Sequence, residues 1–149
     1  MINLDKEECL RFFLYESNME MIIGGKKVFI FENHAEAIIP WGLLSNSQKK
    51  LPYLISLDHH TDTHLAFHSY ASYMHIKNKR EYEDERNSFL KDFDKNNCKG
   101  LFNASKLLNN DEQIDFAIQK NIISHSFSII SGVDNYLDNS SKMSVVQHN

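Results

Sequence analysis

The pattern of apolar and polar positions predicts three short strands. A Gly-Gly pair at residues 24–25 predicts a turn, and the apolar run at residues 28–31 predicts a buried strand. Residues 53–57 predict a second strand that is apolar on both faces, the pattern of a parallel strand covered by helices on both sides. The run SFSII at residues 126–130 predicts a third strand.

Three other stretches have the composition or spacing of helices. Residues 34–50 are helical in composition, but Pro40 lacks an amide donor and predicts a short or broken helix there. Residues 70–95 place large apolar side chains three and four positions apart, which predicts one long or two shorter surface helices. Residues 110–118 predict a short helix with Asn110 as its cap and acidic residues in its first turn.

Strands that alternate with helices are typical of the α/β class. We therefore expect a three-layer, mainly parallel sheet with flanking helices, formed by a single domain over residues 1–149. The chain becomes polar after Gly132, and residues 133–149 are expected to form a frayed tail.

Composition and charge narrow the function classes. The 149 residues are 42% apolar, which is enough for a buried core. The formal net charge of -4 provides no basic surface for nucleic acid or anionic lipid, so neither partner is expected. Cys9 and Cys98 lie far apart without a Cys-x-x-Cys spacing or a secretory signal. We expect a cytoplasmic protein with reduced thiols and no membrane span.

The stretch Asp-His-His-Thr-Asp at residues 58–62 concentrates metal-binding groups directly after the second predicted strand. Residues two apart in an extended chain face the same side, so Asp58, His60 and Asp62 are expected to face one point. Two carboxylates held together would repel each other and would be costly to bury without a cation. The pattern therefore predicts a divalent metal site, and the alternative is a polar surface loop with histidines by chance.

The position of this cluster also favours a ligand site. Open parallel sheets bind ligands at the carboxyl ends of their strands, where residues 58–62 lie. His34 follows the preceding predicted strand and would be a fourth ligand if the two strands are neighbours. Oxygen-rich ligation with imidazole suits Mn²⁺, Fe²⁺ or Zn²⁺, and such a site commonly activates a bound water for hydrolysis.

These residues resemble the first metal half-site of the arginase, or ureohydrolase, superfamily, an Asp-x-His-Thr-Asp element preceded by a lone metal-binding histidine. More closely, four stretches resemble the peptide arginase family in their order along the chain. They are FENHAEAIIPW, LISLDHHTDTHLAF, NNDEQIDFAI and IISHSFSII, and the match covers roughly residues 26–130. The resemblance implies an arginase-like fold that is incomplete in this chain.

The resemblance also implies a two-manganese hydrolase. His34, Asp58 and Asp62 would bind one Mn²⁺, while Asp58 would bridge to a second Mn²⁺ that His60 also binds. The implied substrate is an arginine side chain in a ribosomally made precursor peptide, which is hydrolysed to ornithine and urea. Guanidinium is a poor electrophile, so the nucleophile would be a metal-bound water of lowered pKa, with no catalytic side chain beyond it.

The chain departs from this family in two places. The superfamily supplies its second metal half-site from a later strand that ends in Asp-x-Asp, and the sequence shows no such element. Asp134 and Asp138 have the wrong spacing to replace it, so we expect an N-terminal portion that is truncated before the second half-site. Gln113 stands where the family would have a histidine, which weakens that stretch as a substrate contact.

Three functional hypotheses therefore stay open. They are a peptide arginase-like enzyme, an inactive remnant that binds at most one metal and acts as a binding module, and a different metallohydrolase with a single metal centre. His64 and His68 are candidate outer contacts, His64 also a candidate catalytic group, although a loop histidine is more often simply solvated. Trp41 is expected in the core. An unpaired strand edge would favour a homo-oligomer.

Overall fold

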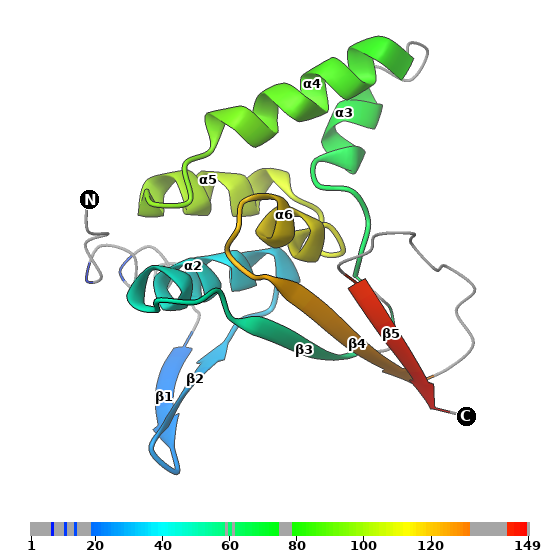
Figure 1. The fold of residues 1–149 in the computed structure, drawn as a ribbon. Coiled ribbons are helices and arrows are strands. Elements are labelled where there is room, and N and C mark those ends of the chain that lie inside the picture. The colour runs from blue at the N-terminus through cyan, green and yellow to red at the C-terminus, as the bar shows by residue number, and fades with distance from the viewer. Residues whose placement is uncertain are drawn as a thin grey trace.

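The computed structural model describes Glu7, Arg11, Leu14, residues 19–58, His60, and residues 62–74, 79–131 and 143–148. These residues form a mixed α/β structure in which helices gather on one side of a small sheet (Figure 1). The α/β class expected from the sequence is confirmed at this level. Within the described residues, no helix has the length and apolar character needed to span a membrane.

The strands belong to two separate sheets. The elements are β1 (Met19–Ile23), β2 (Lys26–Ile30), η1 (His34–Ala37), α2 (Ile38–Ser47), β3 (Tyr53–Asp58), α3 (His68–Met74), α4 (Lys79–Asp92), α5 (Cys98–Leu107), α6 (Gln113–Gln119), β4 (His125–Ser131) and β5 (Met143–His148). β1 and β2 form an antiparallel hairpin. β3, β4 and β5 form a parallel sheet in that order.

The strand expected at residues 28–31 is present as β2, but it does not belong to the parallel sheet. Gly24 and Gly25 have φ angles of 56° and 77°, which L side chains rarely adopt, and they turn the chain so that β2 pairs with β1. Ile22 and Ile23 are 72% and 58% exposed, so the hairpin is not a buried element. A short apolar run alone does not distinguish these two situations.

The second and third expected strands are β3 and β4, which pair in parallel with Tyr53 opposite His125. β5 pairs in parallel with the other edge of β4. Residues 143–148 therefore extend the sheet, whereas a frayed tail was expected over residues 133–149. The strand has two adjacent valines near its middle, and these β-branched residues favour a strand more than the polar residues around them oppose it.

The two faces of the parallel sheet differ sharply in exposure. Ser126 and Ser128 are 1% and 2% exposed, while Tyr53, Ile55 and Leu57 on the opposite face are 69%, 68% and 76% exposed. Within the described part of the chain, helices cover only one face of the sheet (Figure 1). The apolar composition of β3 predicted helices on both sides, and among the described residues they cover one side, because composition alone does not reveal which face is covered.

The hydrophobic core lies between the helices and the covered face of the sheet. Phe67 is fully buried in it, and its ring centroid lies 5.5 Å from those of Phe89 and Phe93 and 5.7 Å from that of Phe116. Burial of one large apolar side chain stabilises the fold by about 1.5–3 kcal/mol. Trp41 packs against the same core, as the sequence predicted.

The broken helix expected around Pro40 is confirmed. η1 is a short 3-10 turn that leads directly into α2, and Pro40 lies in the first turn of α2, where a missing amide donor is tolerated. The stretch 70–95 forms two helices, α3 and α4, which was one of the two expected arrangements.

Helix α6 begins later than the sequence suggested. Its N-cap residue is Glu112, which makes no side-chain cap hydrogen bond, so Asn110 is not the cap. Asp111 and Glu112 consequently precede the helix instead of forming its first turn. At the other end, Asn121 has a φ of 52°, the left-handed conformation that commonly ends a helix.

Helix α5 was not expected from the sequence. The side chain of Asn97 accepts hydrogen bonds from the amides of Lys99 and Gly100, and this cap fixes the first turn. Cys98, the first residue of α5, is disulfide-bonded. This finding corrects the expectation of reduced thiols for that residue.

Candidate metal centre

Three segments bring metal-binding side chains to the carboxyl end of β3. Asp58 is the last residue of β3, Asp62 lies in the loop that follows, and His34 is the first residue of η1. The side chain of Asn33 accepts a hydrogen bond from the amide of Ala35 and caps η1. This cap, rather than a strand beside β3, holds the turn that carries His34.

A different element from the one considered in the sequence brings His34 to the site. His34 was expected there if the strand before it lay next to β3, but β2 and β3 belong to different sheets. The 3-10 turn η1 places His34 there instead, as the contacts below show. The residue was predicted, and the element that positions it was not.

The ligand atoms of His34, Asp58 and Asp62 lie within 4.8 Å of one another. Nδ1 of His34 is 2.9 Å from Oδ2 of Asp62 and 3.6 Å from Oδ2 of Asp58. Asp62 is 8% exposed, whereas the side chain of His34 is 45% exposed, so the group is buried on one side and open to solvent on the other. A His/Asp/Asp group of this kind could hold a metal ion.

The backbone at Asp62 is strained. Its φ of 51° lies in the left-handed region, which costs L residues about 1–2 kcal/mol, although aspartate tolerates it better than most. Such conformations persist where the surrounding contacts hold them, and they cluster at binding sites. The contacts of the Asp62 side chain are therefore part of what maintains this loop.

The electrostatics of the group favour a cation. The pKa of Asp62 is raised above its ordinary value, first because burial disfavours the charged carboxylate and then because Asp58 is negative. Hydrogen bonds from His34 and Gln113 oppose this shift. A divalent ion between the two carboxylates would remove their repulsion, and two carboxylates with one imidazole fit Mn²⁺, Fe²⁺ or Zn²⁺.

The structure does not bring His60 into this group. His60 is exposed, and it lies outside the His/Asp/Asp group found among the described residues. The expectation that residues 58, 60 and 62 face one point assumed an extended chain. Instead β3 ends at Asp58, and Asp62 has a left-handed backbone, so this stretch is not extended throughout.

Gln113 contacts the group from the first position of α6. Its Nε2 donates a 3.1 Å hydrogen bond to Oδ2 of Asp62, and the residue is only 3% exposed. The sequence indicated Gln113 only as a departure from the family pattern, because it stands where the family would have a histidine. No residue type or spacing around Gln113 in the sequence indicates its contact with Asp62, which lies 51 positions away.

The loop at residues 62–67 is fastened to the segment around the start of α6. The amide of His64 donates to the carbonyl oxygen of Asp111 at 3.0 Å, and Nδ1 of His64 lies 2.9 Å from Oδ2 of Asp111. The amide of Ala66 donates to Oδ2 of Asp115 at 2.8 Å. Two aspartates thus hold the loop that carries Asp62.

Glu112 connects the start of α6 to α3 by a further hydrogen bond. Its carboxylate is fully buried and accepts hydrogen bonds from the amides of Ser69 at 2.7 Å and Asn109 at 3.1 Å. Asp111 and Glu112 were expected to be simple first-turn acids. Instead, Asp111 contacts the amide and the imidazole of His64, and Glu112 accepts hydrogen bonds from the amides of Ser69 and Asn109.

The remaining sequence candidates do not join the group. Nδ1 of His68 lies 2.7 Å from the hydroxyl of Tyr82 on α4, at an exposed position. His64 is paired with Asp111, as described above. Asp134 and Asp138 lie outside the described residues.

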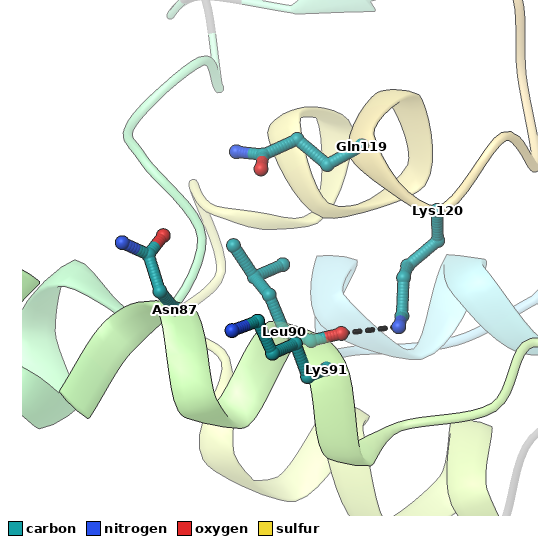
Figure 2. Close-up of a pocket in the computed structure, with 5 residues that line it drawn as sticks. All are labelled: Asn87, Leu90, Lys91, Gln119 and Lys120. Atoms are coloured by element: carbon teal, nitrogen blue, oxygen red, sulfur yellow. Dashed lines mark hydrogen bonds between the residues drawn. The ribbon is translucent and has the colours of Figure 1, made fainter. Parts of the chain in front are cut away.

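A separate pocket between α4 and α6 lies apart from this centre. Figure 2 shows its lining residues, which are Asn87, Leu90, Lys91, Gln119 and Lys120. The amine of Lys120 donates a hydrogen bond to the carbonyl oxygen of Leu90. Since these lining residues supply no carboxylate or imidazole, the pocket is not a second candidate for metal binding.

No protein-family model matches the chain, no curated protein matches its sequence, and no solved structure matches its fold. Function is therefore inferred from the residues of the site and their geometry.

Proposed function

We propose that the chain is a metal-dependent hydrolase of the ureohydrolase type, in which His34, Asp58 and Asp62 hold the first metal ion. The observation that carries this proposal is the convergence of these three ligands within 4.8 Å at the carboxyl end of β3. The resemblance of roughly residues 26–130 to peptide arginases supports Mn²⁺ as the ion and arginine guanidinium as the group hydrolysed.

The side chains of the group fit this role. A divalent ion held there would supply Lewis-acid activation and would lower the pKa of a water molecule bound to it. Asp58 and Asp62 would balance the charge of the ion. Because Nδ1 of His34 faces Asp62, this nitrogen would ligate the ion and the ring proton would reside on Nε2.

The proposed substrate is an arginine side chain within a peptide. His34 is nearly half exposed, so the group is accessible to a long side chain that enters from solvent. The resemblance to peptide arginases supports a guanidinium as the group that would enter. Free arginine has the same guanidinium and serves as the comparison substrate.

The proposal extends to the fold. We propose that β3, β4 and β5 belong to a three-layer arginase-like sheet. Their parallel pairing supports this, as does the apolar face formed by Tyr53, Ile55 and Leu57, since parallel sheets are nearly always covered on both faces.

Urea release tests the proposed activity. The purified chain is loaded with Mn²⁺ and incubated with arginine-containing peptides or with free arginine, and urea is quantified while ornithine is located in the peptide by mass spectrometry. We expect urea release that Asp58→Asn abolishes, because this variant keeps the side-chain shape and removes the charge. A Mn²⁺-loaded wild type that releases no more urea than Asp58→Asn would contradict the hydrolase.

One observation favours a second candidate function, a non-catalytic module that binds a single ion. The resemblance assigns His60 to a second ion, yet His60 lies outside the His/Asp/Asp group among the described residues. This candidate predicts that the chain binds an ion without releasing urea. The same assay therefore separates the two functions.

A further inference from the structure

We propose that Gln113 is a positioning residue of the metal centre, whose amide holds the carboxylate of Asp62 in the orientation that ligates the ion. This inference rests on the metal-binding part of the proposed function and is independent of hydrolysis. It starts from one atom, Oδ2 of Asp62, which lies 2.9 Å from Nδ1 of His34 and accepts a 3.1 Å hydrogen bond from Nε2 of Gln113.

Binding of an ion would change the contact of that oxygen with His34 but would leave its hydrogen bond with Gln113 in place. Nδ1 of His34 would turn its lone pair to the ion, so it would no longer donate a proton to Asp62. The amide of Gln113 does not ionise, and Nε2 would still donate to the carboxylate. Hydrogen bonds of this kind orient ligating carboxylates, and their loss typically costs 10–100-fold in metal affinity.

Burial fixes the orientation of the Gln113 amide. The residue is 3% exposed, and its Oε1 is buried with no hydrogen-bond partner among the described residues. A flipped amide would place Oε1 against the Asp62 carboxylate, where two acceptors repel. An unpaired buried amide oxygen is costly, and departures of this kind occur chiefly at functional sites.

The helix that carries Gln113 is a rigid support. Ile114, Phe116 and Ala117 are at most 1% exposed, so α6 is anchored in the core. Asp62, by contrast, lies in a loop with a left-handed backbone. Metal ligands on loops need support from packed elements to keep their geometry, and Gln113 provides that link.

The test compares two amide-to-carboxylate contacts of the same helix. Gln113→Met keeps the length and apolar bulk of the side chain and removes its donor. Gln119→Met is the matched control, because Nε2 of Gln119 donates a 2.6 Å hydrogen bond to Asp115, which lies outside the His/Asp/Asp group. Gln113→His retains an N–H donor and tests rescue. Mn²⁺ dissociation constants and melting temperatures of the metal-free proteins are measured for each.

We expect Gln113→Met to weaken Mn²⁺ binding about 10–100-fold and Gln113→His to recover part of the affinity. Gln119→Met should stay within about twofold of wild type, because it acts on another carboxylate. The melting temperature of metal-free Gln113→Met should change by less than about 3 °C, since the lost hydrogen bond and the removed unpaired oxygen offset each other.

Equal Mn²⁺ affinity in wild type and Gln113→Met would overturn the inference. A drop in affinity that parallels a drop in metal-free melting temperature would also overturn it, because Gln113 would then only support the fold. A wild type that binds no Mn²⁺ would overturn both this inference and the proposed metal centre. Mn²⁺ binding without urea release would contradict only the hydrolase.

Discussion

Two groups of side chains include residues of the loop that follows β3, and they differ in the contacts that their imidazoles make. The inner group is His34, Asp58 and Asp62. The outer group is the pairs His64 with Asp111 and His68 with Tyr82. In the inner group three ligand atoms from separate segments lie within 4.8 Å. In the outer group each imidazole contacts a single partner near the surface. Nδ1 of His64 lies 2.9 Å from Oδ2 of Asp111, and Nδ1 of His68 lies 2.7 Å from the hydroxyl of Tyr82.

The difference shows that residue type alone does not make a metal site. The side chain of His64 is 57% exposed, and exposed pairs of this kind contribute only about 0–1 kcal/mol. Asp62 is almost fully buried beside a second carboxylate. A cation bound there would offset the free-energy cost of burying one negative charge next to another. Convergence and burial therefore separate the inner group from the outer one.

The largest effect is expected from removal of an inner aspartate. Asp62→Ala removes a ligand with a full charge and should weaken Mn²⁺ binding by more than about 100-fold, beyond what outer contacts cost. Asp111→Ala is the control, because Asp111 also pairs with a histidine but lies in the outer group, and its backbone carbonyl still accepts from the amide of His64. Isothermal titration with Mn²⁺ measures both. Similar losses in the two variants would erase the distinction between the groups.

A smaller effect is expected from removal of the inner histidine. His34→Ala takes away a neutral ligand and leaves both carboxylates, so the Mn²⁺ dissociation constant should rise about 10- to 100-fold. His64→Ala should leave it within about threefold, since its partner Asp111 is outside the group. If His64→Ala weakened binding as much as His34→Ala, the outer pair would belong to the site.

Substitution of His60 tests whether this residue contributes to metal binding. Because His60 is exposed and outside the inner group, His60→Ala should change Mn²⁺ affinity by less than about threefold and leave the number of bound ions unchanged. Elemental analysis after dialysis measures the stoichiometry. A fall from two ions to one would show that the two-ion centre implied by the resemblance forms, and His60 would then join the inner group.

The smallest effect is expected in the outer group. Tyr82→Phe removes the hydroxyl that lies 2.7 Å from His68 and should lower the free energy of unfolding by about 0.5–1 kcal/mol without changing Mn²⁺ affinity. Burial raises the pKa of Tyr82, so the hydroxyl keeps its proton at neutral pH. Urea unfolding of the metal-free protein measures the change. A clear loss of Mn²⁺ affinity would contradict the surface role.

Local signals in the sequence were sufficient for some elements. The apolar run before Asp58 predicted β3, and the α/β pattern predicted parallel strands, as the pairing of β3 with β4 shows. The place of Asp58 and Asp62 directly after that strand also predicted two of the three converging ligands. In these cases the pattern of neighbouring residues is enough to determine the local structure.

Other features depend on contacts between distant segments. His34 was expected to follow a strand of the main sheet, but it is carried by η1, whose cap is made by Asn33. Gln113 bonds Asp62 across a separation of 51 residues, and nothing in the residues around it indicates that contact. The uncovered side of β3 is similar, because an apolar strand has the same sequence whether one face or both are covered.

The central claim, that His34, Asp58 and Asp62 form one metal centre, is tested most directly by the Mn²⁺ content of the purified chain. Equilibrium dialysis followed by elemental analysis is carried out on wild type, Asp58→Ala and, as the control, Asp111→Ala. The predicted result is one ion per chain in wild type and Asp111→Ala at this centre, and none in Asp58→Ala. Mn²⁺ in wild type at no more than the Asp58→Ala level would contradict the claim.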